Sequence, residues 1–286
     1  MQAQQLIQTL KKASLALYDE REAEQIALLT AAHLAGLGDN TAPLRVDPVR
    51  EWPIDEELLQ TTTQRLASSE PMQYILGQTD FFGRIFEVDP RVLIPRPETE
   101  ELVDRIRRAE RGAKRILDIG TGSGCIAISL ALELPTAAVT ALDLSPEALE
   151  VARRNAERLQ ARIDFRQGDA LQELEQLFEP ASFDVIVSNP PYVPASDRKQ
   201  MHRNVLEHEP ALALFVPDED PLRFYRAIAQ AGQRLLTNGG MLYFEIYHAL
   251  ADEMIRLVES LGYREVVVHH DLQDKPRMLC GRKATR

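Results

Sequence analysis

The sequence has few cysteines and no long hydrophobic run, and both scarcities exclude whole classes of protein. Cys125 and Cys280 are the two cysteines among 286 residues, too few for a disulfide framework or a four-cysteine zinc site. No apolar run approaches the ~20 residues that a membrane helix needs, and no apolar segment follows a basic head at the start of the chain. We therefore expect a reduced, cytoplasmic protein with neither a signal peptide nor a membrane span.

Basic charge is scarce as well. The chain has 33 Lys and Arg against 44 Asp and Glu, a formal net charge of −11, whereas sequence-independent nucleic-acid binding needs a basic surface. The short basic run at 107–115 is more typical of a solvated helix end. The six histidines have no metal-ligand spacing. We expect no stable nucleic-acid binding and no metal site.

The hydrophobic period changes along the chain and predicts three parts. Residues 1–70 place apolar side chains at helical spacing. Residues 71–95 are rich in aromatic and β-branched residues around Gly77 and Gly83, which predicts a β-hairpin. From 96 to 286, short apolar runs alternate with helical segments, a pattern typical of a largely parallel sheet covered by helices on both faces. We expect a helical domain, a hairpin linker and an α/β domain with these boundaries.

Six short apolar runs in the α/β part are expected to be strands. They are RILDIG (115–120), AAVTALDL (137–144), IDFRQGD (163–169), FDVIVSN (183–189), GMLYFEIY (240–247) and REVVVHHD (264–271).

A glycine-rich turn, GTGSG at 120–124, follows the first of these runs and precedes a helix. Glycines at such a place let the backbone turn sharply and approach a ligand closely. The dinucleotide fingerprint needs its third glycine at the position of Cys125, so a nicotinamide cofactor is disfavoured. With Asp118 ahead of the alternating glycines, the turn resembles the first motif of class I S-adenosylmethionine methyltransferases.

Two acidic residues strengthen the prediction of a nucleoside site. Asp143 ends the next strand, where a carboxylate can accept both hydroxyls of a ribose; its alternative role as a helix cap is already filled by Ser145. Asp169 ends the third strand, placed to meet an adenine edge, with Ala170 against the ring. The residues expected to bind the cofactor are Gly120, Thr121, Gly122, Ser123, Gly124, Asp143, Asp169, Ala170 and Asn189.

The fourth strand ends in the unusual sequence Asn-Pro-Pro-Tyr. The carboxamide oxygen of Asn189 can accept one hydrogen of a planar NH2 group, and the fixed carbonyl of Pro190 can accept the other. Pro191 stiffens the turn, and Tyr192 offers a flat face for a planar amide or base. We interpret Asn189, Pro190 and Tyr192 as catalytic, acting by positioning, and all four residues as substrate-binding. The alternative is a proline-terminated strand end.

Together, NPPY, LIPRPETEELV, FFGRIFEVDP and ILDIGTGSGCIAISLA resemble the release factor glutamine methyltransferases, the HemK/PrmC family. The resemblance implies a Rossmann-like methyltransferase sheet joined by a hairpin to a small helical N-terminal domain. It also implies methyl transfer from S-adenosyl-L-methionine to the glutamine amide nitrogen in the GGQ motif of class 1 peptide release factors. By this resemblance residues 120–124, Asp143, Ala170 and Asn189 line the cofactor, and residues 189–192 hold the glutamine. Some members carry an aromatic residue where this chain has Ala170.

Three other functions stay open at this point. Glutamine methyltransferases that act on a ribosomal protein form a sister family with nearly the same motifs. Adenine-N6 DNA methyltransferases use a similar motif because adenine also presents an NH2 group, but they need a basic duplex-binding surface. A nucleotide-sensing module without catalysis would not need the amide clamp beside the glycine turn.

Overall fold

The computed structural model describes residues 1–38 and 41–285. Within them, the contacts between residues divide the chain into two compact units. The helical unit comprises Met1–Gln78 together with Met201–Glu209, and the sheet unit comprises Thr79–Gln200 together with Pro210–Arg286. The three-part division expected from the sequence, with boundaries after residues 70 and 95, stays a prediction.

The helical unit is a small bundle with its own apolar core. Its helices are α1 (Ala3–Ser14), α2 (Glu20–Leu34), α3 (Ala42–Val46), α4 (Glu56–Ala67), α5 (Met72–Leu76) and α10 (Arg203–His208). Asp19 caps α2 and Asp55 caps α4 by accepting hydrogen bonds from first-turn N–H groups. The short α10 comes from late in the chain, and the Asn204 amide donates to the Tyr18 hydroxyl at 3.0 Å.

The sheet unit is built on seven strands in the order β10-β11-β9-β6-β3-β4-β5. The pairs from β9 to β5 are parallel, and β11 pairs antiparallel with both β9 and β10. The strands are β3 (Arg115–Ile119), β4 (Ala138–Asp143), β5 (Ile163–Gln167), β6 (Phe183–Ser188), β9 (Leu236–Glu245), β10 (Tyr263–His270) and β11 (Pro276–Lys283).

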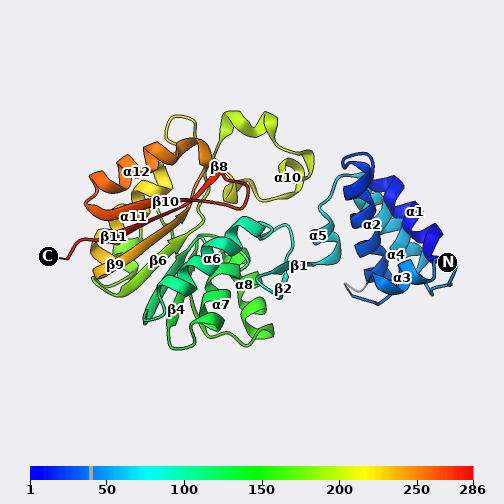
Figure 1. Ribbon diagram of the computed structural model, residues 1–286, viewed down its shortest axis with the longest axis horizontal. Helices are drawn as coiled ribbons and strands as arrows, with labels where there is room; N and C mark the ends of the chain where they lie inside the picture. Colours follow the sequence, from blue (N-terminus) through cyan, green and yellow to red (C-terminus); the bar gives the residue numbers. More distant parts are fainter. Residues whose placement is uncertain (39–40, 286) are drawn as a thin grey trace. The chain divides into compact units, whose positions relative to one another are not determined.

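Helices cover both faces of this sheet (Figure 1). One apolar core packs α6, α7 and part of α8 against side chains such as Ile116 and Val185. The other packs α11 and α12 against side chains such as Leu117 and Ile186, which point to the opposite face because strand residues alternate. The helices are α6 (Pro97–Ala109), α7 (Cys125–Glu133), α8 (Pro146–Arg158), α9 (Leu174–Leu177), α11 (Arg223–Leu235) and α12 (Ala251–Ser260).

Smaller elements complete the sheet unit. The strands β1 (Gln78–Phe81) and β2 (Arg84–Glu87) form the hairpin expected from the sequence, with Gly83 at φ 69° in its turn. A second small sheet pairs β7 (Val193–Pro194) with β8 (Phe215–Val216), and 3₁₀ helices span Ala195–Gln200, Ala211–Ala213 and His248–Leu250.

Three segments differ from the sequence-based expectation. The stretch MQYIL, expected to open the hairpin, is α5, which begins after Pro71 and ends at the left-handed Gly77. The stretch LRVDPVREWP (44–53) is expected from its prolines to be a connector between helices, but its first residues belong to α3, with Pro43 in the first turn. The last strand, β11, was not expected, because charged residues flank its buried centre; ladders to β9 and β10 on both sides hold it in place.

The sheet topology creates a crevice at one point. From β3 the chain moves outward through β4 and β5, then returns to β6 on the other side of β3. In open α/β sheets, ligands bind at the carboxyl ends of strands where the order reverses in this way. In the described part of the chain, no helix is both long enough and apolar enough to span a membrane.

Candidate functional site

A cavity of about 190 Å³ opens at this crevice in the sheet unit. Of the residues predicted to form the site, the cavity is lined by Gly120, Thr121, Gly122, Ser123, Asp143, Asp169, Ala170, Asn189, Pro190 and Pro191. Gly124 and Tyr192 are not among the lining residues. The carboxyl ends of β3, β4, β5 and β6 therefore bring two distant motifs, the glycine turn and the Asn-Pro-Pro sequence, to one cavity.

The glycine turn needs glycine for two different reasons. Gly120 (φ 75°) and Gly122 (φ 55°) have left-handed backbones, and a Cβ atom on either would meet open space. Gly124 also has a positive φ, but a Cβ there would lie 2.9 Å from Ile128 Cδ1 and 3.2 Å from Ala152 Cβ. The first two glycines thus keep the turn bare toward the cavity, whereas Gly124 lets α7 begin close against α8.

Backbone N–H groups fix the carboxylate of Asp143. Its Oδ2 accepts from the Gly122 N–H at 2.8 Å, and its Oδ1 accepts from the Ser145 N–H at 3.0 Å. Ser145 itself caps α8 through the Ala148 N–H, as expected. Burial raises the pKa of Asp143, and the backbone bonds oppose that rise by favouring the charged form. Each carboxylate oxygen keeps a second lone pair for a ligand hydroxyl.

Asp169 and Ala170 line the neighbouring wall of the cavity. The Asp169 carboxylate is held by its own turn, because Oδ1 accepts from the Leu171 N–H at 2.8 Å and Oδ2 from the Gln172 amide at 3.0 Å. The Asp169 N–H donates to Glu173 at 2.7 Å. These short-range bonds give the acid a fixed direction at the end of β5.

Asn189 directly follows β6, and its side chain is hydrogen-bonded to Thr99 of α6. The Asn189 Nδ2 donates to Thr99 Oγ1 at 3.4 Å. No hydrogen bond from the described residues reaches Asn189 Oδ1, so this oxygen is left to accept from a ligand in the cavity. Ser188, directly before it, is fully buried and donates to the Ile119 carbonyl at 2.6 Å, which ties the end of β6 to the end of β3.

Tyr192 is not one of the residues that line the cavity. Its hydroxyl donates to Glu245 Oε1 at 3.1 Å, and its ring stacks on Tyr247 at 6.0 Å between centroids. Burial, followed by the charge of Glu245, raises the pKa of the Tyr192 hydroxyl, so it stays a hydrogen-bond donor. The predicted contact of this ring with a substrate amide stays a prediction.

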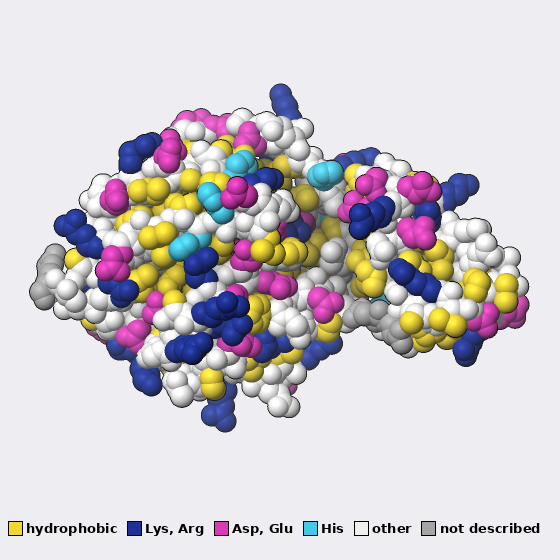
Figure 2. Space-filling model, in the orientation of Figure 1, with side chains coloured by type: hydrophobic (Ala, Val, Ile, Leu, Met, Phe, Trp, Pro, Cys, Tyr) yellow, Lys and Arg dark blue, Asp and Glu magenta, His cyan; other side chains and the backbone are white. Residues whose placement is uncertain are grey.

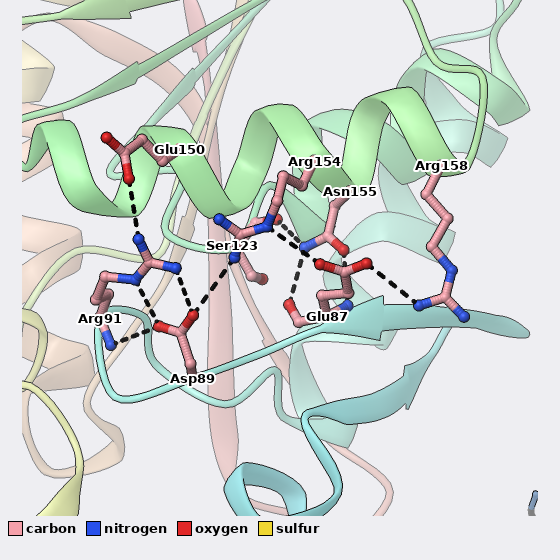
Figure 3. Close-up of polar contacts among 8 residues, drawn as sticks. All are labelled: Glu87, Asp89, Arg91, Ser123, Glu150, Arg154, Asn155 and Arg158. Atoms are coloured by element: carbon pink, nitrogen blue, oxygen red, sulfur yellow. Dashed lines mark hydrogen bonds and ion pairs between the residues drawn. The ribbon is translucent and has the colours of Figure 1, made fainter.

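The run 91–96 forms a further wall that the sequence analysis did not identify. A network of charged and amide side chains anchors the start of this run to α8 (Figure 3). The Arg91 guanidinium contacts Asp89 and also Glu150 of α8, the latter at 3.0 Å. The fully buried Asn155 of α8 pairs with the backbone of Glu87 and also donates to the Ser123 carbonyl at 2.9 Å. One helix therefore holds both the run and the glycine turn.

Thr99 and Glu245 were also missed, although Thr99 lies in the PRPETE sequence that carries part of the family resemblance. Both side chains are 2% exposed, and Thr99 Oγ1 donates to Glu245 Oε2 at 2.6 Å. The sequence did offer one indication of Glu245, a glutamate at the end of an apolar strand. A carboxylate that is buried there needs polar partners, so it indicates a polar cluster.

Comparisons with known proteins agree with this geometry. Residues 110–282 match the family model described as a methyltransferase domain. The chain is 48% identical over 263 residues to the release factor glutamine methyltransferase of Bacteroides thetaiotaomicron, covering 92% of this chain and 94% of that protein. The Flavobacterium psychrophilum and Chlorobaculum tepidum proteins of the same name are 43% and 39% identical, each alignment covering 94% of this chain and 94% and 95% of theirs.

Among solved structures, the fold matches a methyltransferase from Pyrococcus furiosus with a TM-score of 0.53 at 21% identity, covering 71% of this chain and 90% of that one. The fold class expected from the sequence, a Rossmann-like methyltransferase sheet, is thereby confirmed. With relatives of this identity over nearly its whole length, the chain belongs to the release factor glutamine methyltransferase family.

Proposed function

We propose that the protein transfers a methyl group from S-adenosyl-L-methionine to the side-chain amide nitrogen of the GGQ glutamine in class 1 peptide chain release factors. The observation that carries this proposal is that Asn189 lines the same cavity as the bare glycine turn, and that its amide is bonded to Thr99 through Nδ2 and not through Oδ1. The reaction would take place in the cytoplasm, where translation ends.

The cavity residues fit a nucleoside methyl donor. Gly120 and Gly122 present open backbone where side chains would otherwise project, and Asp143 lines the same cavity. Asp169 and Ala170 would border the adenine. When bound, the donor supplies an electrophilic methyl group on a sulfonium. Gly120, Thr121, Gly122, Ser123, Asp143, Asp169, Ala170 and Asn189 line the cavity and would hold it, with Gly124 letting the turn enter α7.

The chain's own groups would act on the glutamine by positioning it. Asn189 Oδ1 and the Pro190 carbonyl would each accept one hydrogen of the target NH2, which holds the nitrogen in one place and raises its electron density. Both acceptors belong to a turn stiffened by two prolines, so little reorganisation is needed during the reaction. Cys125 also lines the cavity, but burial raises its pKa to about 12, so its thiol stays protonated and does not compete as a nucleophile.

The helical unit is our candidate for recognition of the protein substrate. None of its described residues lines the cavity, yet a release factor presents far more surface than one glutamine. Val46, Val49 and Leu58 of this unit are exposed apolar side chains. Acidic and basic side chains intermingle on the visible face of the molecule (Figure 2). Together with the net charge of −11, this favours a protein over a nucleic acid as the partner.

A methyl-transfer assay with three acceptors tests the proposal. The purified protein is incubated with methyl-labelled S-adenosyl-L-methionine and, separately, with release factor, ribosomal protein or duplex DNA. We expect label in release factor alone, located by mass spectrometry on the GGQ glutamine. A release factor in which that glutamine is replaced by alanine is the matched control and should stay unlabelled. Label in ribosomal protein or on adenine, and none in release factor, would overturn the proposal in favour of that acceptor.

A further inference from the structure

A chain of buried polar side chains is hydrogen-bonded to Asn189, and its first member, Thr99, also borders the cavity. Thr99 comes from the first turn of α6 and Glu245 from the end of β9, and both are 2% exposed. Thr99 Oγ1 donates to Glu245 Oε2 at 2.6 Å, and Asn189 Nδ2 donates to Thr99 Oγ1 at 3.4 Å. The Tyr192 hydroxyl donates to the other oxygen, Glu245 Oε1, at 3.1 Å. The Glu245 carboxylate is thus bonded directly to Tyr192, at one end of the Asn-Pro-Pro-Tyr turn, and through Thr99 to Asn189, at the other end.

The direction of these bonds decides which end of the Asn189 amide faces the cavity. A threonine hydroxyl has a single hydrogen, and in Thr99 that hydrogen points at Glu245. Toward Asn189, therefore, Thr99 can only accept, so Asn189 must present its NH2 group. If the amide turned over, its oxygen would face the hydroxyl oxygen with no proton between them. The carboxamide oxygen is left for a ligand.

The surroundings of Glu245 suit this role. Burial raises the pKa of its carboxyl, whereas the hydroxyls of Thr99 and Tyr192 and the nearby guanidinium of Arg277 favour the charged form. The Tyr225 hydroxyl donates to the Glu245 carbonyl at 3.0 Å and holds the backbone at the strand end. A carboxylate bonded in this way is an acceptor on both oxygens, so it keeps both hydroxyl hydrogens turned toward it.

We propose that Thr99 and Glu245 are positioning residues that set the sense of the Asn189 amide, so that Oδ1 and not Nδ2 meets the target amino group. The proposal deepens the proposed function and rests on it for the identity of the acceptor. Neither residue needs to touch the reacting atoms. Their effect passes through Asn189, and for Glu245 also through Tyr192.

Substitutions at Thr99 separate this role from simple packing. Thr99→Val keeps the side-chain shape but removes the hydroxyl, and we expect turnover to fall by about 10- to 100-fold with little change in KM for the acceptor. Thr99→Ser keeps the hydroxyl and should retain most of the turnover. Thr30→Val is the matched control, because Thr30 is fully buried in the helical unit and its hydroxyl has no partner among the described residues. Equal losses in Thr99→Val and Thr99→Ser would overturn the proposal.

A double-mutant cycle shows whether Thr99 acts through Asn189. In an Asn189→Ala background the amide is gone, so adding Thr99→Val should cost less than about twofold more. A full additional loss in that background would mean that Thr99 acts by another route. Glu245→Gln should also lower turnover, because glutamine has one acceptor oxygen for two hydroxyl donors and offers an NH2 group in place of the other.

A spectroscopic measurement keeps the test independent of the acceptor. The side-chain NH2 resonances of Asn189 are assigned by their loss in Asn189→Ala, and we expect them to shift in Thr99→Val and to stay in place in Thr99→Ser. If the Asn189 resonances did not shift in Thr99→Val, the proposal that Thr99 orients the Asn189 amide would be overturned, even if methylation were normal. If the parent protein methylates ribosomal protein or adenine instead of release factor, the proposed function fails. The orienting role of Thr99 and Glu245 is still tested by these spectra and by turnover on that other acceptor.

Discussion

The two ends of the cavity are built in different ways. At the end proposed to bind the cofactor, the acids are held by local bonds, mostly from backbone N–H groups: Gly122 and Ser145 donate to Asp143, and Leu171 together with the Gln172 side chain donates to Asp169. At the target end, side chains hold side chains. The Thr99–Glu245 bond joins positions 146 residues apart, and the Asn189–Thr99 bond joins positions 90 residues apart.

This difference should separate the effects of substitution. Backbone donors remain when a neighbouring side chain is changed. A substitution of one acid at the cofactor end should therefore leave the other residues in place and appear mainly as weaker cofactor binding. At the target end each side chain depends on the next, so one change disturbs the orientation of the whole chain and appears mainly in turnover.

The largest expected effect is at Asn189. Asn189→Ala removes one acceptor from the target amino group, and loss of one preorganised hydrogen bond at a reacting centre typically costs ~10²–10³-fold in turnover. Asn189→Asp keeps acceptor oxygens but loses the NH2 group that donates a hydrogen bond to Thr99, so we expect intermediate activity. Single-turnover methylation at saturating cofactor measures both. Parent-like turnover in Asn189→Ala would mean that the Asn-Pro-Pro-Tyr turn only terminates the strand. The two ends of the cavity would then not differ in how substitutions affect turnover.

The next largest effect is expected at Asp143. Asp143→Ala removes a charge-assisted acceptor for the ribose and should weaken cofactor binding by ~10- to 100-fold, with turnover at saturating cofactor changed less. Calorimetric titration of the folded variant with S-adenosyl-L-methionine measures this. Glu147→Ala is the matched control, because Glu147 is a nearby acid in the first turn of α8 that does not line the cavity. Unchanged cofactor affinity in Asp143→Ala would exclude the ribose contact.

A smaller effect, on stability, is expected at Asp118 beneath the glycine turn. Its Oδ2 accepts from the Thr121 hydroxyl at 2.6 Å, its Oδ1 has no partner among the described residues, and burial raises its pKa to about 7. Because the folded pKa exceeds the unfolded one, ionisation opposes folding, and stability falls as pH rises from about 4 to 7.

Asp118→Asn, which cannot ionise, tests this pH dependence. We expect the variant to gain roughly 1–2 kcal/mol in unfolding free energy relative to the parent between pH 5 and pH 8, after relaxation of the protein around the charge. Urea unfolding at both pH values measures the difference, which does not depend on any constant offset between the two proteins. Parallel pH profiles would show that Asp118 does not change its ionisation on folding.

The smallest effect is expected outside the cavity. Replacing Val46 and Val49 of the helical unit by serine should raise KM for whole release factor by roughly 3- to 10-fold and leave methylation of a short GGQ peptide unchanged. Leu272→Ser is the matched control, since Leu272 is 93% exposed but belongs to the sheet unit. An equal rise in KM for the short peptide would assign the effect to the catalytic site instead of to recognition.

Several features of the cavity were visible in the sequence because they depend on neighbouring residues. The glycine turn after β3, the cap at Ser145 and the acid at the end of β4 each follow from short-range rules for strand ends and helix starts. The Asn-Pro-Pro-Tyr turn was visible for the same reason, since two prolines after an apolar strand leave few backbone conformations. In contrast, β11 was missed because its pairing partners, and not its composition, make it a strand.

The sequence by itself therefore determined the kind of fold, the glycine turn after β3 and the presence of an asparagine amide at the end of β6. Only the tertiary structure decided which way that amide faces. The orientation depends on Thr99 in α6 and Glu245 in β9, whose side chains meet Asn189 through the packing of the sheet and its helices. A hydrogen bond between distant positions has no local sequence pattern, because its partners are chosen by the fold and its direction by the single hydrogen of a hydroxyl group.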